Sequence, residues 1–188
     1  MKYILTLIVG ISLLSCTIEM SQQEKETYLK NGKEIGQTVV KKLGSSLMKQ
    51  MKSGGPKQAI PFCNTAALPF TKEIVTKYNV AIKRTSHRLR NGKNRPNTDE
   101  KRVLDSYLLS LSEGKSLMPM IKKEADGKVH FYAPIKVENK CLACHGSVGK
   151  EVKKETYNLI KSLYPNDKAT GFKAGDLRGV MSITFYEK

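Results

Sequence analysis

The chain has 188 residues and a formal net charge of +16, from 33 lysines and arginines against 17 acidic residues. A hydrophobic content of 39% is enough for one core and argues against a wholly disordered chain. The basic residues are scattered among single acids, as at Lys122-Lys123 and Lys153-Lys154, and form no platform interleaved with aromatic residues. We therefore expect a solvated basic surface and no nucleic-acid partner.

The N-terminal segment predicts export and a lipid anchor. After Met1-Lys2, an apolar run over residues 4–14 has the length of a signal peptide and is too short to cross a bilayer. Leu13-Leu14-Ser15-Cys16 is typical of a lipoprotein signal site, where a small residue precedes the cysteine that is acylated. The alternative is an ordinary cleaved signal with an incidental cysteine. We expect a lipoprotein signal peptide over 1–15, a tether over 16–21 after lipidated Cys16, and a single domain over 22–188. The expected location is the periplasmic side of a bacterial membrane.

Two amphipathic helices are predicted next. Within residues 22–52, apolar side chains recur every four positions, the spacing of a helix with one buried face: Ile35, Val39, Leu43, Leu47 and Met51. Ser53-Gly54-Gly55 ends this helix, and Pro56 suits the first turn of a second one. The second helix is expected to bury Cys63 on its apolar face and to kink at Pro69, which has no N–H to donate.

The remaining pattern alternates between strands and helices. A short strand is predicted over 80–84, a basic loop over 85–97, and a helix from Thr98 that Gly114 stops. A hairpin follows around Asp126-Gly127, and the alternation along its second strand predicts burial of one face only. A helix over 151–164 and a strand over 179–186 complete an α+β fold with an antiparallel sheet.

Cys141-Leu142-Ala143-Cys144-His145 is the motif with the most chemical information. Two thiols at this spacing can each add to one vinyl group of a porphyrin, and the adjacent imidazole then becomes an axial iron ligand. A thioredoxin-like pair needs no such histidine, a disulfide across two residues would be strained, and a zinc site wants a second pair of ligands. Because c-type haem is attached outside the cytoplasm, the export signal favours one covalent haem c.

The second axial ligand is left open by the residues themselves. Cys63 is the cysteine that remains, and it is either an inert buried thiol or a thiolate bound to iron. Other ligands are available: Met118, Met120, Met181, His87 and His130. His130 lies on the polar face of its predicted strand and is expected to be solvated. Arg84, Arg88 and Arg90 are candidate partners of the haem propionates, the alternative being a basic loop that faces water.

In four stretches the sequence resembles a family of bacterial single-haem c-type proteins with a PAS-like fold. These are Ala59-Ile60-Pro61-Phe62-Cys63-Asn64, Arg84-Thr85-Ser86 with Arg90-Asn91, Cys141 to Gly146, and Tyr164-Pro165 through Asp167 and Phe172 to Gly179. The resemblance implies a PAS-like antiparallel sheet with flanking helices and a long N-terminal helix. It also implies that Cys63 is an axial thiolate opposite His145, and that Tyr164, Asp176 and Arg178 line the haem edge. The chain departs from the family at His87 and at Gly92-Lys93.

The family is thought to sense redox state or small ligands at the iron. We accordingly expect a redox or gas sensor or binding module, because a thiolate ligand binds ferrous iron more weakly and its departure would admit a ligand. An electron-transfer cytochrome is the alternative and requires both axial ligands to stay. A small haem peroxidase would need a distal acid–base pair, for which only His87 beside an arginine is available, so we do not expect an enzyme. The expected partners are membrane lipid and a separate redox or signalling protein.

Overall fold

The computed structural model describes residues 20–124 and 126–186, apart from the side chains of residues 66–71. The predicted signal peptide and Cys16 lie outside the described residues. Within those residues, no helix has the length and apolar character needed to cross a membrane.

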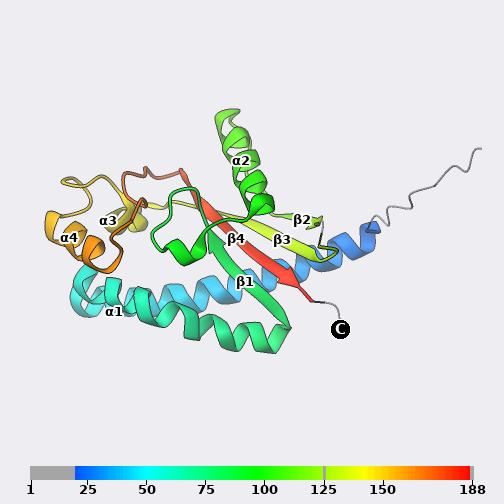
Figure 1. Cartoon of the computed structure of the whole chain (residues 1–188), viewed down its shortest axis with the longest axis horizontal. Helices are drawn as coiled ribbons and strands as arrows, with labels where there is room; N and C mark the ends of the chain where they lie inside the picture. Colours follow the sequence, from blue (N-terminus) through cyan, green and yellow to red (C-terminus); the bar gives the residue numbers. More distant parts are fainter. Residues whose placement is uncertain (1–19, 125, 187–188) are drawn as a thin grey trace, which may run out of the picture.

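An antiparallel sheet of four strands forms the centre of the domain (Figure 1). Its order is β1-β4-β3-β2, with bounds Val80–Thr85, Leu177–Phe185, Val129–Lys136 and Met120–Lys123 respectively. The C-terminal strand β4 therefore lies between β1 and β3 and pairs along both of its edges. The predicted α+β fold, with a PAS-like antiparallel sheet and flanking helices, is confirmed.

The long helix α1 (Gln22–Tyr78) consists of two arms that cover one face of the sheet. Ser21 and Glu24 form a capping box at its start. Its backbone leaves helical geometry at Gly54 and Gly55, and Gly55 has a φ of 62°, which glycine adopts without strain. The chain reverses there, and the ion pair between Lys42 and Glu73 joins the two arms. The predicted helix boundary at these glycines is thus a turn between arms, while the backbone stays helical through Pro69.

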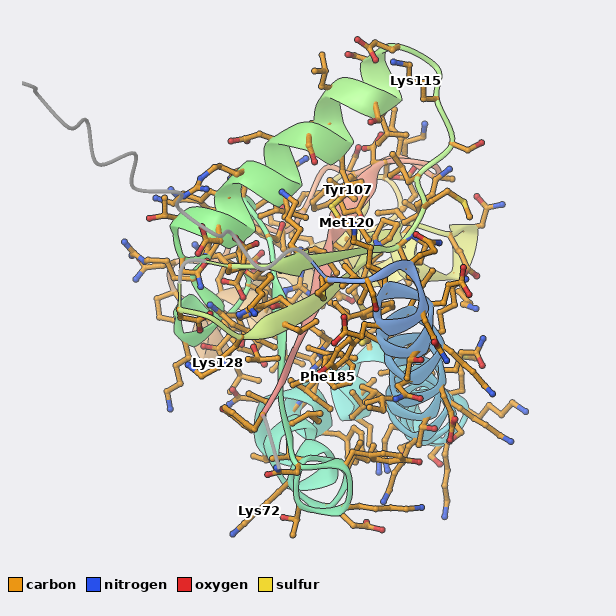
Figure 2. All side chains as sticks on the ribbon, turned by 90° about the vertical axis from the view of Figure 1, so that its right-hand side faces the viewer. Lys72, Tyr107, Lys115, Met120, Lys128 and Phe185 are labelled. Carbon is orange, nitrogen blue, oxygen red and sulfur yellow. The ribbon has the colours of Figure 1, made fainter. Side chains whose placement is uncertain are left out.

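The two faces of the sheet are both buried, one under α1 and the other under α2 (Thr98–Ser112). On the α1 side the packed residues are Ile35, Val39, Ile74, Val80, Phe131, Met181 and Ile183. On the α2 side they are Val103, Leu104, Tyr107, Tyr132, Leu177 and Val180. Figure 2 shows Tyr107 and Met120 on the α2 side and Phe185 on the α1 side.

Burial of both faces corrects two expectations about β3. The strand is buried on both faces over its first half, because α2 covers the face that the alternation of polar residues assigned to water. His130 on that face is only 8% exposed, whereas the sequence predicted a solvated side chain. It bonds to Thr184 at 3.1 Å, lies 3.3 Å from Asp126, and stacks on Tyr132. These contacts satisfy the imidazole away from water.

Short helices gather at one end of the sheet, next to the turn of α1. They are η1 (Gly92–Asn94), η2 (Asn139–Cys141), α3 (Leu142–His145) and α4 (Lys154–Leu163). A small core of Ile60, Val152, Ile160 and Tyr164 packs α4 against the second arm of α1. The α4 helix starts later than predicted because Glu151 instead accepts a hydrogen bond from the backbone of Ser147 at 2.9 Å.

Candidate functional site

The Cys-x-x-Cys-His motif occupies a single helical turn. Cys141 ends η2 with right-handed helical backbone angles, and α3 continues from it to His145. Residues three apart on a helix share a face, so the two thiols lie on the same side of the turn. Gly146 ends the turn, and a Cβ at that position would meet the Leu142 carbonyl oxygen at 2.8 Å. The cysteines are half-buried, so the motif is presented near the surface of the domain.

The imidazole of His145 is held in one tautomer. Its Nδ1 lies 2.7 Å from the carbonyl oxygen of Ala169. Because a carbonyl only accepts, Nδ1 must carry the proton, and the lone pair is left on Nε2. Burial, together with the positive charges of Arg178 and Arg90, lowers the pKa of His145 to about 3. The ring is therefore neutral at physiological pH, which is the state that binds a metal ion.

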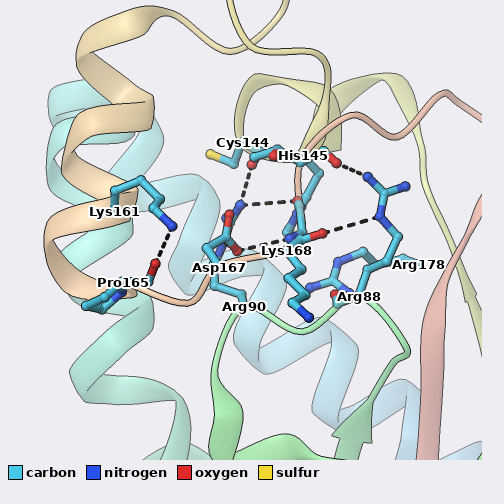
Figure 3. Close-up of polar contacts among 11 residues, drawn as sticks. Arg88, Arg90, Cys144, His145, Lys161, Pro165, Asp167, Lys168 and Arg178 are labelled. Carbon is cyan, nitrogen blue, oxygen red and sulfur yellow. Dashed lines mark hydrogen bonds and ion pairs between the residues drawn. The ribbon is translucent and has the colours of Figure 1, made fainter.

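The segment after α4 wraps around the motif and is fastened by Arg90 (Figure 3). The guanidinium donates from Nε to Asp167 at 3.0 Å, and from Nη2 to the Cys144 carbonyl at 2.6 Å and the Ala169 carbonyl at 3.3 Å. The Asp167 carboxylate is fully buried, and its Oδ1 also accepts from the Ala169 backbone at 3.1 Å. Arg90 thus ties the motif to the segment that orients His145.

Arg88 and Arg178 support the same segment from its other side. Arg88 donates to the carbonyls of Thr170 and Lys168, and its guanidinium lies 3.9 Å from the centre of the Phe172 ring. That ring meets His145 edge-on at 6.2 Å between centroids. Arg178 donates to the Arg88 carbonyl at 3.1 Å, and burial with neighbouring arginines lowers its pKa to about 10. The propionates expected as partners of Arg88 and Arg90 stay a prediction. In the structure both arginines also bond to groups of the chain itself, because folding brings the Asp167 carboxylate and several backbone carbonyls to them.

Cys63 comes to this site from the second arm of α1. Its thiol interacts electrostatically with Arg84 and Arg90, and also with Cys144 and Tyr164. The residue is exposed, whereas a buried position was predicted: Ile60, one turn earlier on the same arm, belongs to the small core against α4, and Cys63 does not. Desolvation by surrounding protein nevertheless raises the pKa of the thiol, and the two arginines oppose that rise.

Arg84 and Tyr164 complete the surroundings of Cys63. Tyr164 is buried, and burial raises the pKa of its hydroxyl, with the Cys63 thiol adding to the rise. Arg84 is exposed, yet desolvation lowers its pKa, the same combination as at Cys63. Within the part of the chain that the structure describes, the side chain of Arg84 has no hydrogen bond or ion pair to another residue, while its backbone belongs to the β1–β4 ladder. Its guanidinium is therefore available to an anionic group.

The alternative iron ligands are engaged or placed elsewhere. His87 Nε2 lies 2.7 Å from Asp105 of α2. Met181 belongs to the core under α1, Met120 packs on the core under α2, and Met118 is 65% exposed. Asp176, which the resemblance places at the haem edge, accepts a hydrogen bond from the Lys173 backbone at 2.7 Å in the turn before β4. The structure therefore gathers Cys63, Arg84, Arg90, Tyr164 and Arg178 around the motif.

Three members of the site were not predicted from residue chemistry. They are the Asp167 carboxylate, the Ala169 carbonyl and the Phe172 ring. Every residue has a backbone carbonyl, so the sequence cannot single out the one that bonds His145. An aromatic residue in a glycine-rich loop is only a weak indication of a binding site. The one available signal was Asp167 itself, a single acid between Lys161 and Lys168 in a stretch of family resemblance.

Comparison with known proteins agrees with this architecture. No curated protein sequence matches the chain. The crystal structure of the cyanobacterial heme-protein Tll0287 superposes with a TM-score of 0.60 at 23% identity, covering 90% of this chain and 98% of that one. The family model described as Tll0287-like matches residues 15–185. A match over that length shows that the chain belongs to the Tll0287-like family.

Proposed function

We propose that this protein binds one haem c, attached covalently at Cys141 and Cys144, with His145 as an axial ligand. The observation that carries the proposal is the Nδ1 hydrogen bond from His145 to Ala169, 2.7 Å long, which leaves Nε2 free beside two half-buried thiols. A histidine oriented by a backbone carbonyl is the usual arrangement of a metal-ligating imidazole. Bound haem would supply an iron centre that takes up one electron and binds small ligands. The solved relative is itself a heme-protein.

The second axial ligand in this proposal is the Cys63 thiolate. Cys63 lies within electrostatic range of Cys144 and of two arginines. Desolvation raises the pKa of the Cys63 thiol, and the positive charges of the two arginines oppose that rise and so act in favour of the thiolate. Arg84 is the propionate partner, since its guanidinium is exposed and is not engaged by a described residue. Arg88 and Arg90 then contribute positive charge to the site while they hold its protein frame.

The two proposed ligands differ in how firmly the protein holds them, and this difference favours a sensor. His145 is fixed by Ala169, Arg90 and Phe172. Cys63 is exposed, as are Pro61, Asn64 and Thr65 around it. Bound to haem iron, a thiolate would stabilise the ferric state, and because Cys63 is exposed, its side chain could leave the iron on reduction without disturbing the core. The proposed function is therefore a redox or small-ligand sensor, with a gas as one candidate ligand.

Electron transfer is the second candidate, favoured by the position of the motif near the surface. Exposed Val148 and Lys150 follow it, an apolar residue and a cation of the kind that meets an acidic redox partner. An electron carrier would keep both axial ligands in both oxidation states. In either case we propose that Cys16 anchors the protein in lipid on the periplasmic side of the membrane. Cys16→Ala should move it from the membrane to the soluble fraction.

The test uses the full chain expressed with the machinery that attaches c-type haem. Intact mass shows whether one haem is bonded, and optical and EPR spectra of the ferric and ferrous forms identify the ligands. Cys63→Ala should abolish the low-spin thiolate signal, while Thr65→Ala, an exposed neighbour on the same arm, should leave it intact. Loss of the thiolate on reduction supports the sensor, and its retention supports the electron carrier. Colourless protein without added mass would refute haem binding altogether.

A further inference from the structure

We propose that Arg90 and Asp167 are positioning residues for His145 that shift the reduction potential of its iron in opposite directions. This inference rests on the proposed haem site and adds to it a means by which the protein sets the potential. Arg90 and Asp167 are linked to His145 only through backbone groups, so the Cys-x-x-Cys-His motif alone does not indicate their role.

His145 and Arg90 share one hydrogen-bond acceptor, the backbone carbonyl oxygen of Ala169. Ala169 O accepts from His145 Nδ1 at 2.7 Å and also from Arg90 Nη2 at 3.3 Å. The same Nη2 donates to the carbonyl of Cys144 at 2.6 Å. One guanidinium nitrogen therefore fixes the acceptor of the histidine and the backbone of a haem-attachment cysteine together. A lysine has the charge but not the planar fork that reaches these carbonyls and Asp167 at once.

The two carboxylate oxygens of Asp167 differ in their hydrogen bonding. Its Oδ1 accepts from Arg90 Nε at 3.0 Å and from the Ala169 backbone at 3.1 Å. Its Oδ2 is buried and has no hydrogen-bond partner among the described residues. A buried, unpaired carboxylate oxygen is normally unfavourable, and an asparagine would keep both Oδ1 bonds without the buried charge. We infer that the negative charge of Asp167, and not only its bonding capacity, is used at this site.

The charges of Arg90 and Asp167 would act on the reduction potential of an iron bound to His145. A positive charge nearby favours the ferrous state, which carries one positive charge fewer than the ferric state. Arg90 also competes for the Ala169 carbonyl, which weakens the pull of that carbonyl on the Nδ1 proton and makes the imidazole a poorer electron donor. Both effects raise the potential. Asp167 offsets them, because its carboxylate neutralises part of the Arg90 charge.

The experiment compares Arg90→Gln and Asp167→Asn with wild type by spectroelectrochemical titration, after intact mass has shown haem in each. Arg90→Gln should lower the midpoint potential, and Asp167→Asn should raise it. The matched control is the pair of exposed Arg102 and half-buried Asp99 on α2, 2.9 Å apart, where Arg102→Gln and Asp99→Asn should leave the potential unchanged. A merely structural role would loosen the site in both variants and move the two potentials in the same direction.

The outcomes separate this inference from the haem proposal. Wild-type protein without haem refutes the proposed function and this inference with it. Wild-type protein with haem, but with potentials that stay constant or shift in one common direction, overturns this inference alone. Should Arg90→Gln fail to fold, Asp167→Asn decides by itself, since an upward shift supports the inference and any other result overturns it.

Discussion

Two glycines one turn apart on α1 provide a test of how closely this helix lies on the sheet. At Gly32 an added Cβ would meet Phe131 at 2.3 Å from Cγ and 2.4 Å from Cδ2. Carbon atoms in contact normally stay about 3.5–4.0 Å apart, so Gly32→Ala must push the helix away by roughly 1 Å. Phe131 is only 1% exposed and is packed on every side, so its ring has no space to move into.

Two opposing effects set the change in the free energy of unfolding. Crowding a packed core costs about 1–3 kcal/mol, and replacing glycine in a helix returns about 1 kcal/mol. Gly32→Ala should therefore lower the free energy of unfolding by up to about 2 kcal/mol. At Gly36 the added Cβ would lie 3.5 Å from Met181 Sδ, an ordinary contact. Gly36→Ala should consequently raise the free energy of unfolding by about 1 kcal/mol, because alanine favours the helix more than glycine does and nothing is crowded by the added Cβ.

Urea unfolding followed by far-UV circular dichroism measures both variants under one set of conditions. The difference between them should be about 1–3 kcal/mol, or several degrees in Tm for a domain of this size. Equal stabilisation by the two alanines would refute the close approach of α1 to Phe131. Equal destabilisation would show instead that Met181 leaves no room at Gly36.

Three further predictions concern the frame of the site. In Gly179→Ala the added Cβ would lie 2.2 Å from the Thr85 carbonyl oxygen, so the end of β1 that leads to Arg88 and Arg90 must shift. Urea unfolding should show a free energy of unfolding lower by about 1–3 kcal/mol. Lys83→Met should remove about 2 kcal/mol of stability by leaving the buried Glu100 carboxylate without its 2.6 Å partner, and Lys83→Met with Glu100→Gln should recover part of that loss. In haem-free protein the folded-state pKa of His145, about 3, lies below its ordinary 6.5, so only the unfolded chain takes up the proton between these values. Stability should fall as pH drops from 6.5 towards 3, by up to about 1.4 kcal/mol per unit, and His145→Asn should lack this part of the pH dependence.

Features that depend on neighbouring residues could be predicted from the sequence. The Cys-x-x-Cys-His motif needs only five consecutive residues, and these residues form a helical turn in the structure. The start of α2 at Thr98 follows from its first-turn acids and its Asn97–Glu100 capping box. The chain reversal at Gly54-Gly55 and the turn at Gly127, which has a φ of 77°, follow from the backbone freedom of glycine.

Features that depend on distant residues were decided by the tertiary structure. His130 is buried against Thr184 and Tyr132 on the face of the sheet that α2 covers, and the residue pattern of β3 alone does not reveal that helix. Arg88 and Arg90 find their partners some 80 residues further along the chain, at Asp167 and the carbonyls that follow it. Cys63 comes within electrostatic range of Cys144 only because the second arm of α1 packs against α4. The sequence by itself therefore determined which thiols and which imidazole make up the proposed haem site. The packing of α1, α4 and the loop around Asp167 decided how those groups are oriented and charged, because only folding brings these segments together.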